Sequence, residues 1–253
     1  MSLRRKIEAL AGHLTGRRKN RAPPRGMDFA LDIAYALPLF RASIVFDVGA
    51  NVGQSAKLFL AKFPDSHIYC FEPVTDTYHL LQHNLHDTER VDCHQLAFGS
   101  TTRTGEMILQ GSSDMFFLLG QSSELPNKEV RSESVNIDTL DAFCRANKID
   151  RISFLKIDTE GGDLDVLRGA EMMLGEQRID IVQVEAGMSP TNSRHVPFQS
   201  LKNFLEDHGY YLFGIYEQVK EWPTGEPHLR RTNPVFISQQ VIDKNRKQKR
   251  PRT

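Results

Sequence analysis

The sequence has 253 residues, 40% of them apolar and 25% charged, which is the composition of an ordinary globular protein. This balance excludes collagen-like and wholly disordered chains, and no apolar run is long enough to predict a membrane-spanning helix. The net charge of zero hides two basic ends. Residues 1–26 carry eight Lys or Arg and one acid, residues 241–253 carry six and one, and the stretch between them carries 18 basic and 30 acidic residues.

The basic ends are predicted to flank one folded domain. Apolar residues recur at helical spacing over 2–14, and the Pro-rich residues 22–26 are typical of a linker. We therefore expect a basic N-terminal helix and linker over residues 1–26, a domain over 27–240 and a basic disordered tail over 241–253. Basic ends can attract anionic lipid headgroups, which would give peripheral membrane contact through the N-terminus, although solvated, frayed tails are the more ordinary interpretation.

The cysteines indicate the compartment. Cys70, Cys93 and Cys144 form no C-x-x-C pair, and their number is odd. This argues against a disulfide framework and against a zinc site. It fits a reducing environment, so we expect a cytoplasmic protein.

After the linker, predicted strands alternate with predicted helices. Between them, residues 99–136 show only short strands and loops. The last two strands leave no room for a helix and should pair as a hairpin. Strands are predicted at 43–48, 66–71, 91–97, 152–157, 179–184, 210–215 and 234–237, and helices at 54–62, 76–84, 138–147, 164–174 and 198–208.

This alternation predicts an α/β fold. Buried apolar strands separated by helices indicate a mostly parallel, seven-stranded sheet with helices on both faces, closed by an antiparallel C-terminal hairpin. In such a sheet the ligand binds at the carboxyl ends of the strands. The residues that follow each strand are therefore the first candidates for a site.

The first motif, Asp47-Val-Gly49-Ala-Asn51-Val-Gly53, joins the first strand to its helix. Its glycines permit a tight turn and the close approach of a ligand. A second acid, Glu72, ends the second strand, where a carboxylate can accept hydrogen bonds from both hydroxyls of a ribose. Nicotinamide-dependent oxidoreductases and S-adenosylmethionine (SAM) methyltransferases share this arrangement.

Asp47 helps to separate these two classes. The pyrophosphate of a dinucleotide favours bare backbone amides without a nearby carboxylate, whereas the ammonium and sulfonium of SAM suit one. Asn51 also replaces a glycine of the dinucleotide pattern. The ordinary alternative is that Asp47 caps the turn and that Glu72 is an exposed acid at a strand end.

The second motif surrounds the ends of two neighbouring strands. Lys156 and Asp158 share one face of the strand over 152–157, Glu160 begins the following turn, and Glu185 ends the strand over 179–184. Asp158 and Glu185 could hold a divalent cation such as Mg²⁺. They could instead share a proton, so that one has a raised pKa and acts as a base, or they could pair with Lys156 and cap the next helix.

These motifs together resemble the FkbM-type SAM-dependent methyltransferases. The resemblance spans roughly residues 44–237. One departure is Asp163, where the family commonly has Glu. The motifs that carry the resemblance are Asp47-x-Gly49-x-Asn51-x-Gly53, Phe71-Glu72-Pro73, Ile137-Asp138-Thr139-Leu140-Asp141, Lys156-Ile157-Asp158-x-Glu160-Gly161 and Val166-Leu167-Arg168-Gly169-Ala170.

The resemblance implies a Rossmann-like class I methyltransferase fold and transfer of the SAM methyl group to a hydroxyl. The acceptor is expected to be a small molecule or a glycan, often a sugar of a glycolipid, polysaccharide or natural product. No specific nucleic acid is expected, and homo-oligomerisation stays open. Cofactor contacts are expected from Asp47, Gly49, Asn51, Gly53, Glu72, Pro73, Ala97 and Asp158.

The acceptor should lie near Asp158, Glu160 and Glu185. A sugar hydroxyl is a poor nucleophile at neutral pH and needs a base or a metal. The base candidates are Asp158, Glu185, Lys156 if its pKa is depressed, and His195 in the loop after residue 184, although a surface histidine is the commoner case.

Three further expectations concern the rest of the chain. Residues 111–131 should help to shape the acceptor pocket. Trp222 either lines an acceptor groove or packs in the core. An NAD(P)-linked oxidoreductase and a non-catalytic methyltransferase-like binding module remain the alternative functions.

Overall fold

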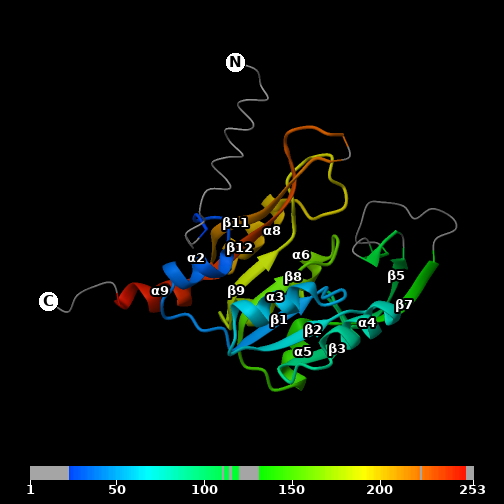
Figure 1. Ribbon diagram of the computed structural model, residues 1–253, viewed down its shortest axis with the longest axis horizontal. Helices are drawn as coiled ribbons and strands as arrows, with labels where there is room; N and C mark the ends of the chain where they lie inside the picture. The colour runs from blue at the N-terminus through cyan, green and yellow to red at the C-terminus, as the bar shows by residue number, and fades with distance from the viewer. Residues whose placement is uncertain (1–22, 110, 114–115, 120–130, 223, 249–253) are drawn as a thin grey trace, which may run out of the picture.

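The computed structural model describes residues 23–109, 111–113, 116–119, 131–222 and 224–248 (Figure 1). The predicted helix over residues 2–14 and the end of the predicted tail, 249–253, lie outside this part of the chain. Within it, no helix combines the length and the apolar character that crossing a membrane requires.

The main sheet confirms the predicted α/β fold. Its central strands run parallel in the order β9-β8-β1-β2-β3, and β12 joins antiparallel beside β9, with β11 on the outer edge of β12. The strands are β1 (Ile44–Val48), β2 (His67–Phe71), β3 (Val91–His94), β8 (Ile152–Ile157), β9 (Ile179–Val184), β11 (Tyr210–Lys220) and β12 (Leu229–Ser238).

An eighth strand, β10 (Ala186–Gly187), extends the fifth predicted strand. Gln183 pairs with Val235, and Ala186 pairs with Thr232, so the ladder against β12 continues in register past Glu185. The two hairpin strands are also longer than their predicted ranges.

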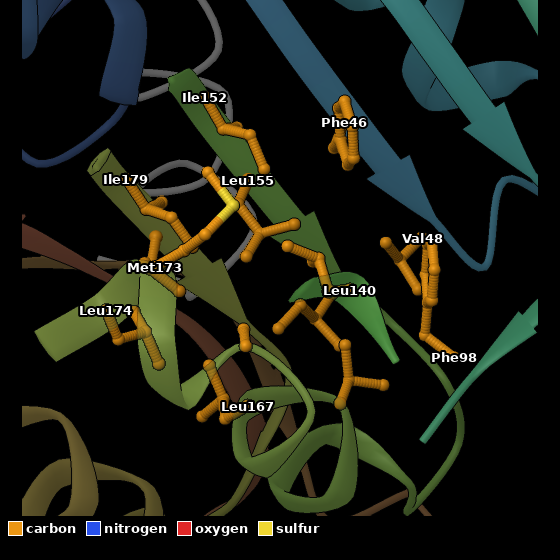
Figure 2. Packing of buried hydrophobic residues seen from close by; sticks show 14 of the residues in the cluster. Phe46, Val48, Phe98, Leu140, Ile152, Leu155, Leu167, Met173, Leu174 and Ile179 are labelled. Atoms are coloured by element: carbon orange, nitrogen blue, oxygen red, sulfur yellow. The ribbon is translucent and has the colours of Figure 1, made fainter. Parts of the chain in front are cut away.

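Helices cover both faces of the sheet. The structure contains α2 (Phe29–Ala36), α3 (Gln54–Lys62), α4 (Thr75–Leu85), α5 (Leu140–Ala146), α6 (Asp163–Arg168), α7 (Glu171–Gly175), α8 (Phe198–Asp207) and α9 (Gln239–Gln248). The first three and α9 contribute to one apolar core, and α5 to α8 contribute to the other. Figure 2 shows the second core, in which Leu140, Leu167 and Met173 pack on Leu155.

Three elements differ from the predictions. The helix expected over 164–174 is split into α6 and α7, because the backbone leaves helical geometry at Ala170 and α7 starts with the amides of Met172 and Met173 donating to Asp141. The prediction of a disordered tail from residue 241 is wrong for the described part. There α9 buries Val241, and the Asn245 Oδ1 accepts a hydrogen bond from the Leu39 amide at 3.0 Å. Helix α2 has no counterpart among the predictions.

The short strands expected after residue 99 belong to a separate small sheet. It contains β4 (Ala97–Phe98), β5 (Arg103–Leu109), β6 (Phe117–Leu118) and β7 (Arg131–Asp138), in the order β4-β7-β5-β6. The third predicted strand therefore ends early, at His94, and its last residue belongs to β4. The small sheet has its own apolar cluster, which includes Met107 and Leu118.

Candidate functional site

A cavity of about 300 Å³ lies at the carboxyl ends of β1, β2, β8 and β9, with the small sheet contributing to its wall. This is the lower end of the volumes typical of small-molecule sites. Most residues singled out in the sequence line it, namely Gly49, Asn51, Glu72, Pro73, Ala97, Lys156, Asp158, Glu160 and Glu185. Asp47, Gly53 and His195 do not.

The turn after β1 is held tightly against its neighbours. Gly49 has a φ of 79°, and a Cβ on it would lie 1.9 Å from the backbone oxygen of Asp158. The amides of Gly49 and Ala50 both donate to the carbonyl of Phe71, at 3.1 and 3.0 Å. Only glycine allows this approach, which brings the ends of β1, β2 and β8 together around the cavity.

Glu72 is a buried acid with spare hydrogen-bonding capacity. Its Oε2 accepts from the Asn51 amide at 3.1 Å and its Oε1 from the Val74 amide at 3.0 Å. Burial raises the pKa of Glu72 to about 7, against the effect of these two bonds. A carboxylate has about four acceptor positions, so two remain for a ligand in the cavity that Glu72 lines. The interpretation as an exposed strand-end acid is therefore wrong.

Asp47 lies beneath the cavity instead of in its wall. It is fully buried, and its Oδ1 lies 3.3 Å from Lys156 Nζ, which is also 3.1 Å from Asp158 Oδ2. Asp47 therefore pairs with Lys156, and it is not among the residues that line the cavity. Burial alone would lower the pKa of Lys156, but the two carboxylates hold that pKa above its usual range. This raised pKa favours the charged form of Lys156 and is the opposite of the depressed pKa that a base role requires.

Gly53 also has a structural role. It begins α3 with a φ of 93°, and a Cβ on it would lie 3.1 Å from the side chains of Leu81 and Leu85 in α4. Gly53 thus permits α3 and α4 to pack closely. Gly53 is not among the residues that line the cavity, so this packing role is what the structure shows for it.

Asp158 and Glu185 form the acidic wall of the cavity, and their environments differ. Burial raises the pKa of Glu185 to about 7, and the charge of Asp158 adds to this effect. Burial also acts on Asp158, but the neighbouring Lys156 overcomes it and holds the pKa of Asp158 below its usual range. Two adjacent carboxyls whose pKa values diverge in this way are typical of acid–base sites.

Cations from two other elements hold the Glu185 carboxylate. Arg231 of β12 donates to its Oε1, and His195 Nε2 lies 3.0 Å from its Oε2. The same His195 nitrogen lies 3.5 Å from Glu160 Oε2. Both carboxylates therefore share one buried imidazole.

The protonation of His195 follows from its second neighbour, Asn192. The Asn192 Nδ2 donates to the carbonyl of Arg230 at 3.0 Å, so its Oδ1 faces His195 and accepts from Nδ1 at 3.0 Å. Burial would lower the pKa of His195, but Glu160 and Glu185 raise it to about 9. The two carboxylates therefore favour the imidazolium form of His195, which argues against the predicted role of His195 as a direct base.

Asp163 is a brace that the sequence interpretation missed. Its Oδ2 accepts from the amide and hydroxyl of Thr159 at 3.2 and 2.8 Å, and its Oδ1 accepts from the Glu185 amide at 3.0 Å. These bonds tie the turn after β8 to the end of β9. The sequence did contain a signal for this role, because Asp163 stands where the resembled family commonly has Glu. The shorter side chain requires the two segments to lie closer together.

Other parts of the cavity wall were anticipated only in outline. Leu96 and Phe98 line it beside the predicted Ala97. Ser113 and Phe116 represent the predicted contribution of 111–131, of which 114–115 and 120–130 lie outside the described residues. Trp222 is 73% exposed and is not among the residues that line the cavity, so core packing is wrong for it.

Comparison with known proteins assigns this chain to a family. The profile of the methyltransferase FkbM domain matches residues 47–212. The chain is similar to Methyltransferase 1 of Beauveria bassiana, with 27% identity over 78% of this chain and 81% of that protein. It is also similar to 2-O-methyltransferase NoeI of Sinorhizobium fredii, with 21% identity over 72% and 75% of the two chains.

A further relative is hexuronic acid methyltransferase AglP of Haloferax volcanii, with 26% identity over 58% of each chain. Among solved structures, M. capricolum TrmK in complex with S-adenosyl-homocysteine aligns over 85% of this chain and 70% of that one, at 12% identity and a TM-score of 0.45.

Proposed function

Because the chain belongs to the FkbM methyltransferase family and is a SAM-dependent methyltransferase, we propose that it methylates a hydroxyl group of a sugar acceptor. The observation that carries this proposal is Glu185, a buried carboxylate with a pKa near 7 in the wall of the cavity. A hydroxyl acceptor needs such a base, whereas an amine or a thiol ionises more easily. One relative is named for hexuronic acid, which supports a sugar acceptor, and another is named for 2-O-methylation, which supports transfer to oxygen.

The cavity fits SAM on the side of β1 and β2. The two free acceptor positions of Glu72 suit the ribose hydroxyls, and Leu96, Ala97 and Phe98 offer an apolar wall for the adenine. When bound, SAM supplies an electrophilic methyl group on a sulfonium. The backbone at Gly49 and Asn51 would hold the methionine part, and Asp158 would border the methyl position.

The chain's own residues then act on the acceptor. Glu185 would accept the hydroxyl proton while the acceptor oxygen forms its bond to the methyl carbon. The bond between that carbon and the sulfonium sulfur would break, and its electron pair would stay on sulfur and neutralise the sulfonium charge. Arg231 and His195 fix the two oxygens of Glu185. Asp163 fixes its backbone, and this preorganisation aligns the base with the acceptor.

A divalent cation at Asp158 and Glu185 fits this arrangement poorly. Lys156 already pairs with Asp158, and Arg231 and His195 already pair with Glu185. Glu160, Glu185 and His195 do offer three ligand atoms within 4.8 Å of one another, but an ion there would have to displace the proton on His195. Dialysis against EDTA is therefore expected to leave turnover unchanged. A loss that Mg²⁺ or Mn²⁺ restores would overturn this.

The proposal is tested with SAM labelled in its methyl group and a panel of sugars that includes hexuronic acids and neutral hexoses. The expected result is a labelled sugar whose NMR spectrum shows an O-methyl group. The label on nitrogen, carbon or sulfur of an acceptor would contradict it.

A further inference from the structure

The β11–β12 hairpin projects from the edge of the sheet where the cavity opens. β12 runs antiparallel to β9, so residues of β12 before Arg231 lie beyond the end of β9 at Val184. β11 and β12 are still paired there, because Lys220 faces Leu229. Figure 1 shows this hairpin in orange, reaching past the neighbouring strands.

Two consecutive arginines connect the hairpin to the site. Arg231 lines the cavity and donates to Glu185. Val219 pairs with Arg231 and Lys220 pairs with Leu229, which makes Arg230 the extra residue of a β-bulge. A bulge breaks the strict alternation of side chains along a strand and often redirects one of them beside a site. Arg230 is therefore adjacent in the chain to the cavity residue Arg231, while its own side chain bonds to Glu221, just past the end of β11.

Trp222 stands beside this second arginine. Its ring centroid lies 6.0 Å from the guanidinium carbon of Arg230, and it is 73% exposed. One exposed aromatic ring is ordinary by itself. Here, however, the neighbouring polar groups are fixed, because Arg230 donates to the buried Glu221 at 3.0 Å, and His228 lies 3.8 Å from the second oxygen of Glu221.

An open aromatic face beside fixed charged groups matches the chemistry of a sugar ring. A pyranose has an apolar C–H face that packs on an indole, and hydroxyls around its rim that bond to groups such as Arg230.

We propose that Trp222 is a platform for a second sugar ring of the acceptor, so that the enzyme acts on an oligosaccharide or polysaccharide. The inference rests on the proposed function and names its substrate class. Trp222 follows the end of β11 at Lys220 and is not among the residues that line the cavity, so a sugar ring packed on it would be a different ring from the one at Glu185.

Fluorescence tests this directly, because Trp222 is the only tryptophan in the sequence. The full chain with S-adenosylhomocysteine is titrated with hexagalacturonate, maltohexaose and monomeric galacturonic acid. The expected result is a change in indole emission with at least one hexasaccharide, at a concentration at least tenfold below that for the monosaccharide. No change with either hexasaccharide overturns the proposal.

Kinetics provide the matched control. Trp222→Ala is expected to raise KM for the active hexasaccharide roughly tenfold at unchanged kcat, and Trp222→Phe should restore most of the loss. Tyr211→Ala removes an aromatic ring that is 48% exposed at the other end of the hairpin, and it should leave KM unchanged. Equal effects of the two alanine variants overturn the platform.

The two proposals fail in different ways. Efficient methylation of monosaccharides without an emission change keeps the sugar acceptor and overturns the platform. An emission change with hexasaccharides that never become methylated keeps the platform and contradicts the proposed function.

Discussion

Replacing Glu185 with Gln is expected to lower kcat by about 10²–10⁴-fold, the usual contribution of a general base. The amide keeps the size of the side chain and can still accept from Arg231, but it cannot take the acceptor proton. The affinity for SAM should be unchanged, because Glu185 lies on the acceptor side of the cavity. Steady-state kinetics with labelled SAM and calorimetry with unlabelled SAM measure the two quantities.

The Glu185→Gln variant is also expected to change the pH dependence of the reaction rate. Glu185 acts as a base only when ionised, and its pKa is near 7, so kcat of the wild type at saturating SAM and acceptor should rise as pH increases through about 7. SAM must be saturating because the pKa of Glu72 is also raised to about 7, and its ionisation would affect SAM binding. The variant should lack the rise in kcat. Glu176→Gln, at an acid with a 57% exposed side chain, is the matched control and should retain both rate and profile. An unchanged kcat in Glu185→Gln would remove Glu185 from the chemistry.

Substitution of Gly49 by Ala is expected to abolish SAM binding and to destabilise the fold by several kcal/mol. The φ of 79° alone costs an L-residue about 1–2 kcal/mol. The added Cβ would also lie 1.9 Å from the Asp158 carbonyl. That carbonyl belongs to backbone that is held in place, since the Asp158 amide donates to Val48 at 3.0 Å. Urea denaturation and SAM titration measure the two effects.

Gly175→Ala is the control for Gly49→Ala. Gly175 ends α7, its φ is not in the left-handed region, and nothing lies within 4 Å of its added Cβ. Replacement there should be neutral or should stabilise the protein by about 0.4–1 kcal/mol through the unfolded state. A Gly49→Ala protein that matches this control in stability and in SAM affinity would show that the turn tolerates a side chain.

The central strands could be predicted from the sequence because their chemistry is local. β8 and β9 are mostly apolar, every residue in them is buried, and their observed bounds equal the predicted ones. The break between α6 and α7 could not be predicted, because Asp141, which accepts from the first amides of α7, approaches only in the folded chain. The small sheet escaped prediction for a similar reason, since β4 pairs with β7 across a long segment.

The residues of the site also divide into those that could be predicted from the sequence and those that could not. Glu72, Asp158 and Glu185 could be found because strand ends converge at one edge of a parallel sheet. Burial then decided what each acid does. Asp47 follows the same rule of position but lies beneath the cavity floor. Arg231 carried no signal in the sequence, because the predicted strand began at residue 234 and the observed one begins at Leu229.

We infer that the two sides of the cavity have different functions. Glu72 binds SAM, and Glu185 activates the acceptor hydroxyl. Calorimetric titration of SAM into the wild type, Glu72→Gln and Glu185→Gln tests it most directly. In Glu72→Gln the side chain has a single acceptor oxygen, which must serve the two backbone amides that Glu72 binds in the wild type. No acceptor position is then left for the ribose, so SAM should bind about 10–100-fold more weakly. Glu185→Gln should bind SAM like the wild type. An equal loss of SAM affinity in both variants, or full SAM affinity in Glu72→Gln, would contradict this division of functions.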